Sequence, residues 1–386
     1  MQDPIAKAQS SQPAPLPRFT KLDAFNPHRP GFECKHEADV NPPFTAEADA
    51  LFQQGMAATS NAVWSAERNY KKAAEVWTQA AWLGHWKAQF NLAGLYLQGN
   101  GVAQDLDKAL QLTEELMRQG VPDAWDNMGA YFMGGVGDIK QDASVAYAFW
   151  QKAADMGSMA AQAYLGEKFL GTYDDPPTFW SNRTVSRKML ECAFAQGSGN
   201  AAYMLGLDLN GHNISLGESY ARALITFHEG VKLGSEKSAN SLSSTFRRGE
   251  PLIENRIDAS RAERYSVLGD ALWHNPDLRF PNLDKVLPLP PARLPKWNGD
   301  EDTLIDAAKG VVPAPIIKPT PGAKLSGRAH IPDGWALPAN PVPPQISAAA
   351  ATGPGGQVQR RRGAADLALH RRAGSCWSSP TSLASA

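Results

Sequence analysis

The sequence has little cysteine, no excess of either charge and no long hydrophobic run. Its 386 residues contain three cysteines, Cys34, Cys192 and Cys376, and none belongs to a C-x-x-C pair. Three cysteines in a chain this long are too few for a disulfide framework, and their spacing fits no cysteine-type metal site. No apolar run approaches the ~18 residues of a membrane helix. We therefore expect neither a disulfide-stapled miniprotein nor a transmembrane segment.

Charge and the N-terminal composition limit the partners and the compartment. Lys and Arg total 38 and Asp and Glu total 39, so the formal net charge is −1. A balanced chain has no overall attraction for nucleic acid or an anionic membrane, so we expect no nucleic-acid partner. The first twenty residues lack the apolar core of a secretory signal. We therefore expect a periplasmic protein if a leader has been removed, and a cytoplasmic protein otherwise.

The sequence also lacks the usual motifs of catalysis. It has no G-x-S-x-G, Walker loop or H-E-x-x-H. Cys34 and His36 form its one close Cys/His pair, which could be half of a metal site or a nucleophile beside its base. No second pair nearby completes a site, so we favour two ordinary loop residues. We expect no enzyme activity, no cofactor and no metal; a hydrolase using Cys34 and His36 is the less favoured alternative.

A repeated glycine pattern is the main positive feature of the sequence. Five segments end in a short Ala-rich helix followed by glycine, at Gly84, Gly120, Gly157, Gly197 and Gly234, which lie 36 to 40 residues apart. A small residue stands eleven positions before each glycine. A mostly large residue stands seven positions before it: Trp77, Thr113, Trp150, Leu190 and Phe227. This pattern predicts a helix that packs closely on its neighbours.

A second helical pattern follows each of these glycines. Apolar residues recur at i, i+4 and i+8, starting from Ala88, Ala124, Ala161, Ala201 and Ala239. This spacing places them on one face of a helix. The unit is therefore helix, glycine turn, helix, glycine turn, and a degenerate sixth unit extends to about residue 276. We predict an all-α fold for this region.

The best-matching units resemble the Sel1-like repeat family, which is related to the tetratricopeptide repeats. The resemblance is carried by Ala88-x-x-x-Leu92-Ala93-x-x-Tyr96-Leu97-x-Gly99-x-Gly101 and by Ala146-x-x-Phe149-Trp150-x-Lys152-Ala153-Ala154-x-x-Gly157. The fourth unit departs from the pattern with a long loop that contains Pro176-Pro177. The resemblance implies a right-handed α-solenoid of helix-turn-helix repeats that binds other proteins.

Changes in composition divide the chain into four parts. We predict an extended N-terminal segment over 1–47 and a solenoid of five to six repeats over 48–276. A Pro-rich irregular segment over 277–346 should pack on the solenoid or trail from it, and whether it occupies the groove is left open. Residues 347–386 are poor in aromatic residues and rich in Ala, Gly, Ser and Arg, so we predict a disordered tail.

By analogy with tetratricopeptide repeats, the first helix of each unit should line a concave groove. The inward positions are −1, +2, +6 and +9 from the starting alanine. The candidate protein-binding residues are Lys87, Phe90, Leu97, Asp123, Asp126, Met133, Glu167, Tyr203 and Asn210. Three of them are acidic, which favours a partner with a basic patch. A solvated inner face without a partner is the alternative.

Four tryptophans fall outside the repeat core register: Trp64, Trp86, Trp125 and Trp180. Exposed aromatic residues near a groove are typical interface anchors. We keep them as candidate anchors, with packing against a neighbouring repeat as the alternative for each.

The resemblance also suggests a specific function. The repeats followed by ARLPKWNGD and GRAHIPDGW in the Pro-rich segment look like a bacterial repeat-plus-tail family. Some Sel1-like proteins of this sort are immunity proteins of type VI secretion systems, which bind and neutralise phospholipase effectors, usually in the periplasm. We therefore expect an immunity protein whose partner is a lipase effector. A general scaffold or regulator of envelope or signalling complexes is the alternative, and the oligomeric state is not predicted.

Overall fold

The computed structural model describes residues 16–62, 65–171, 180–211 and 219–310, and within these residues it is all helical. The helices are α1 (Ala46–Ala58), α2 (Tyr70–Trp82), α3 (Trp86–Gln98), α4 (Leu106–Arg118), α5 (Pro122–Gly134), α6 (Ala143–Met156), α7 (Met159–Phe169), α8 (Arg183–Ala195), α9 (Gly199–Leu209), α10 (Tyr220–Lys232), α11 (Glu236–Arg248), α12 (Ala259–His274), α13 (Leu283–Val286) and α14 (Glu301–Lys309). None of the described helices has the length and apolarity needed to span a membrane. The predicted all-α solenoid is confirmed.

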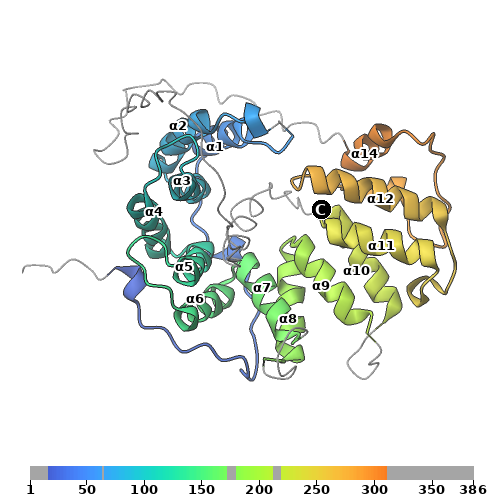
Figure 1. Cartoon of the computed structure of the whole chain (residues 1–386), viewed down its shortest axis with the longest axis horizontal. Coiled ribbons are helices and arrows are strands. Elements are labelled where there is room, and N and C mark those ends of the chain that lie inside the picture. The colour runs from blue at the N-terminus through green and yellow to red at the C-terminus, as the bar shows by residue number, and fades with distance from the viewer. Residues whose placement is uncertain (1–15, 63–64, 172–179, 212–218, 311–386) are drawn as a thin grey trace, which may run out of the picture.

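The twelve helices from α1 to α12 form six antiparallel pairs. Each pair stacks on the next, and α3, α5 and α7 lie on the inner side of the curve while α4, α6 and α8 lie outside (Figure 1). The curve is nearly closed, because the amide of Asn61, after α1, donates to the carboxylate of Asp277, after α12, at 2.8 Å. The inner helices therefore line the inner side of a nearly closed curve, and we call the surface that they line the trough (Figure 1).

Capping residues set the boundaries and the register of the inner helices. Except in α5, which begins at Pro122 without a side-chain cap, the N-cap side chain of each inner helix accepts the backbone N–H three residues later, as His85 does from Ala88 and Ser198 does from Ala201. In the last pair the cap is Ser235, which accepts from the N–H of Ser238. The repeat therefore starts at Ser238, and the predicted start at Ala239 is one residue too late.

Large side chains of the outer helices insert against small residues of the inner ones. A Cβ added at Gly55, Gly129 or Gly206 would meet the ring of Trp77, Trp150 or Phe227, respectively. The indole of Trp77 also donates to the carbonyl of Phe52, and that of Trp150 to the carbonyl of Asp126, each at 3.1 Å. These rings are nearly fully buried. The contact explains the large residues of the repeated pattern, and it requires a small residue at the facing position of the inner helix.

The N-terminal segment, which we predicted to be extended, ties the first units together over its described residues, 16 onward. It includes two short 3₁₀ helices, η1 (Pro17–Phe19) and η2 (Glu37–Asp39). Arg18 pairs with Glu114 of α4 at 2.6 Å, and Arg29 pairs with Asp155 of α6 at 2.8 Å. The segment then passes beside α7 and α5 before it reaches α1 (Figure 1).

The C-terminal segment covers the end of the solenoid as far as residue 310. Phe280, Leu283, Leu287 and Leu304 are buried in the cluster formed with α10, α11 and α12. The guanidinium of Arg264, from α12, donates to the carbonyls of Val286 and Pro295. The start of the Pro-rich segment thus packs on the solenoid. The rest of it and the predicted tail over 347–386 lie outside the described residues.

Replacing Gly206 by alanine should destabilise the fold, because the added Cβ would lie 2.6 Å from Phe227. We expect a loss of about 1–3 kcal/mol in the free energy of unfolding, measured by urea titration. The matched control is Gly94→Ala, where an added Cβ meets nothing within 4 Å. That variant should gain about 0.5–1 kcal/mol from helix propensity. Equal losses at both positions would contradict the inferred packing.

Candidate protein-binding site

The inner positions of α3, α5, α7, α9 and α11 form a trough with two different halves. We call the part lined by α3 and α5 the covered half and the part lined by α9 and α11 the open half. Side chains of the covered half are buried or half-buried, whereas several in the open half are exposed. This difference decides which of the predicted residues can meet a partner.

Asp123 and Asp126, predicted as solvent-facing acids of the groove, are buried with exposed fractions of 5% and 6%. The hydroxyl of Ser158 donates to Asp123 Oδ1 at 2.6 Å. Desolvation raises the pKa of Asp123 well above its ordinary value, and the nearby Glu37 raises it further. The prediction that these two acids attract a basic partner is wrong, because the protein itself covers them.

Residues 36–39 of the N-terminal segment provide part of this cover. A carboxylate oxygen of Glu37 accepts the backbone N–H of Met159 at the start of α7, at 3.4 Å. Desolvation raises the pKa of Glu37, and it lowers the pKa of Lys87. The charges of Glu37, Asp49 and Asp123 offset part of the shift at Lys87. Lys87 therefore belongs to an internal cluster of charges and is half-buried.

The remaining candidates of the covered half and of α7 take part in packing. Phe90 and Leu97 lie against the core of α3 to α6, and Met133 lies against that of α6 to α8. Glu167 on α7 is half-buried. This packing leaves these residues little surface for a partner.

The open half presents its side chains to solvent. Leu207 on α9 is 42% exposed, and Asn200 is exposed beside it. Tyr203 and Asn210 are half-buried, and the ammonium of Lys237 on α11 lies 5.6 Å from the centroid of the Tyr203 ring. Asn240 and Arg247 continue the exposed stripe along α11. The arrangement is an aromatic and aliphatic centre with a polar rim, which suits protein binding.

Sequence reasoning missed the contribution of α11 to this surface. With Ser238 as the repeat start, Lys237, Asn240, Ser244 and Arg247 take the four inward positions. The one-residue error at Ala239 hid them. The signal that could have found them is Ser235, since a serine stands at the same cap position of α7 and α9, as Ser158 and Ser198.

The tryptophans proposed as anchors pack against the protein itself. Trp86 is only 3% exposed, so its prediction as an exposed anchor is wrong: it fills the core next to α4. Trp125 is half-buried against Phe149, and Trp180 stacks edge-on to Phe25 at 5.2 Å. For both, packing is the interpretation that the contacts favour. Trp64 lies outside the described residues.

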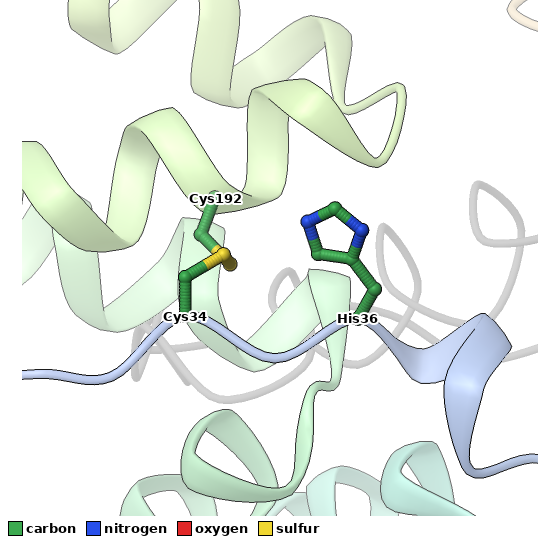
Figure 2. Close-up of side chains that lie close together, drawn as sticks. All are labelled: Cys34, His36 and Cys192. Carbon is green, nitrogen blue, oxygen red and sulfur yellow. A yellow bond between two sulfur atoms is a disulfide. The ribbon is translucent and has the colours of Figure 1, made fainter.

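Cys34 and Cys192 form a disulfide that fastens the N-terminal segment to α8, with their Cα atoms 5.6 Å apart (Figure 2). His36 lies beside it, and the ligand atoms of the three residues are within 4.8 Å of one another. The bonded sulfurs are not thiolates, so neither the metal site nor the hydrolase alternative has its sulfur ligand or nucleophile here. The two cysteines are 158 residues apart in the sequence, so their pairing could not be predicted from their spacing.

The Sel1 repeat family model matches residues 86–120 and 126–158, and the model of a domain of unknown function, DUF6396, matches residues 238–315. The chain is similar to "Protein sel-1 homolog 2" of Homo sapiens, with 28% identity over 127 residues. That match covers 33% of this chain and 18% of the human protein, so the chain spans less than a fifth of this relative.

Solved structures match over much more of their length. The immunity protein Pa5087 from Pseudomonas aeruginosa is 31% identical, with 67% of this chain and 95% of that chain covered and a TM-score of 0.52. The immunity protein PA5088 from the same organism is 29% identical, with 68% and 95% covered and a TM-score of 0.54. These similarities extend across nearly the whole of both neighbours.

Removing the disulfide should loosen the N-terminal segment and lower stability. Since the bond closes a loop across 158 residues, we expect Cys34→Ser to cost about 2–5 kcal/mol in the free energy of unfolding. Urea titration with and without a phosphine reductant measures it. Reductant should destabilise the wild-type chain and have no further effect on the variant; an unchanged wild-type midpoint would contradict the structural role.

Asp123→Asn should raise stability at neutral pH relative to the wild type. The pKa of Asp123 is raised in the fold, so the folded state holds a proton that the unfolded state releases, and stability falls as pH rises through the interval between the two values. Each unit of pKa difference corresponds to about 1.4 kcal/mol. The gain of the variant should shrink as the pH is lowered toward 4, measured by urea titration. A gain independent of pH would contradict this origin.

Proposed function

Because the chain belongs to the Sel1-repeat family and is similar to the immunity protein Pa5087 of Pseudomonas aeruginosa over nearly the whole of that protein, we propose that it is itself an immunity protein that neutralises a toxic effector by binding it. The identity of 31% with Pa5087 extends over 95% of that protein. The proposal needs no chemistry from this chain, only a surface that fits the effector.

The observation that carries the proposal is the open half of the trough. Leu207 exposes 42% of its surface on a helix held rigid by its neighbours, between the polar residues Asn200 and Asn210. A preformed surface loses little conformational entropy on binding, which favours a tight complex. A partner that places an apolar anchor against Leu207 and Tyr203 would be held over the open half of the trough.

We propose that the effector is a phospholipase and that the encounter takes place in the periplasm. The phospholipase class and the type VI secretion route rest on the family resemblance. The periplasm draws further support from the bond between Cys34 and Cys192, because Cys34 is exposed and such disulfides persist in oxidising compartments. If this chain binds over the active site of the lipase, lipid substrate cannot reach that site.

The experiment pairs the purified chain with the phospholipase encoded beside its gene. We expect one-to-one binding by calorimetry and loss of lipase activity on lipid vesicles. Leu207→Asp should weaken binding by roughly 30-fold, since a charged side chain would replace the apolar centre. The matched control is Ile225→Asp on the outer helix α10, which is 54% exposed and should bind as the wild type does.

Two results would count against the proposal in different ways. If the wild-type chain neither binds nor inhibits the lipase, the immunity function with that target is wrong. If Leu207→Asp and Ile225→Asp bind equally well, the partner uses another surface.

A further inference from the structure

A pocket of about 280 Å³ lies between α11, α12 and the segment that leads into α14. Its walls include Arg247 from α11, Glu263, Ser266 and Asp270 from α12, and Trp297 and Glu301 from the C-terminal segment. Arg247 also belongs to the inward stripe of α11, so the pocket adjoins the far end of the open half. It lies within the residues matched by the domain of unknown function.

The pocket arises from a departure from the repeat. In the other five units the residue eight positions after the cap of the outer helix is Trp77, Thr113, Trp150, Leu190 or Phe227. The cap of α12 is Asp258, so the same position is Ser266. Most units fill this place with a large side chain, whereas the last unit has a small hydroxyl. A slot between the helices is therefore left open.

The charges around the pocket are mostly negative. Glu263, Asp270 and Glu301 are exposed, and none of the three forms an ion pair with another residue in the described part of the chain. Arg247 is the one cation among the residues that line the pocket. Three carboxylates against one guanidinium favour a cationic occupant and disfavour an acidic one.

Aromatic side chains strengthen this preference. Trp297 forms one wall, and the guanidinium of Arg264 already lies 5.4 Å from the centroid of its ring. A second tryptophan, Trp273, lies three residues after Asp270 on α12 and is 66% exposed. Indole rings beside carboxylates are suited to guanidinium and ammonium groups. Trp273 does not line the pocket itself, but an exposed tryptophan on the same helix is typical of a protein interface.

We infer that this pocket receives an arginine or lysine side chain of the partner protein, so that it is a specificity pocket at the end of the trough. The identity of the partner in this inference rests on the proposed function. The preference of the pocket for a basic side chain does not. A basic partner is therefore expected again, but at another site. The acids that would recognise the basic side chain are Glu263, Asp270 and Glu301, because Asp123 and Asp126 are buried.

The probe is N-acetyl-arginine methylamide, added to the full chain labelled with ¹⁵N-tryptophan. The indole signal of Trp297, assigned with Trp297→Phe, should shift with a saturable, millimolar dissociation constant. The neutral isostere N-acetyl-citrulline methylamide should leave it unchanged. Equal shifts from both compounds, or no saturable shift from the arginine probe, would overturn the inference.

Two variants separate the pocket from its surroundings. Glu263→Gln/Asp270→Asn/Glu301→Gln should weaken probe binding by roughly tenfold, since it removes the carboxylates and keeps the shape. Ser266→Trp should abolish binding by filling the slot. The control Glu47→Gln/Glu67→Gln/Asp107→Asn removes three exposed acids elsewhere and should bind as the wild type does. Equal losses in the control and the first variant would show a nonspecific charge effect and contradict the pocket.

Calorimetry with the lipase completes the test. The pocket variants should weaken the complex without changing the folding of the chain, checked by circular dichroism. If the probe binds and the lipase does not bind even the wild type, the proposed function fails while the pocket stands. If the lipase binds and the probe does not, the pocket is wrong while the immunity function stands.

Discussion

The structure depends on one contact that most units repeat: a large side chain of the outer helix pressed against a small residue of the inner helix. Trp150 against Gly129 and Phe227 against Gly206 are examples. A larger residue in place of either glycine would force the helices apart, and a small residue in place of either ring would leave a void. Close contact within each pair lets successive pairs stack on one another, and the inner helices of this stack line the trough (Figure 1).

This contact is also why so much of the fold can be predicted from the sequence. It places a large residue at a fixed offset before the turn glycine of most units, and that offset is visible without any structure. The caps add a second, independent signal of register, as Ser198 and Ser235 show. The last unit was misplaced by one residue because Ala239 matched the starting alanine of the other units while its cap pointed to Ser238.

The site was harder to predict, because its character comes from contacts between residues far apart in the sequence. The repeat register predicted an inward position for Asp123, but it contained nothing about Glu37, which lies near Asp123 in space. Pairing of Cys34 with Cys192 across 158 residues is likewise a property of the folded chain. Periodicity reports which face a residue occupies; it does not report what else is packed on that face.

The N-terminal segment thereby converts a uniform solenoid into an asymmetric one. A solenoid of similar units would offer similar inner surfaces along its length, with no reason for a partner to prefer one end. Covering α3 and α5 leaves α9 and α11 as the accessible surface, and the small Ser266 gives that end a pocket the other units lack. Specific recognition by such a protein therefore depends on the departures from the repeat, while the repeat itself supplies the rigid frame that holds them in place.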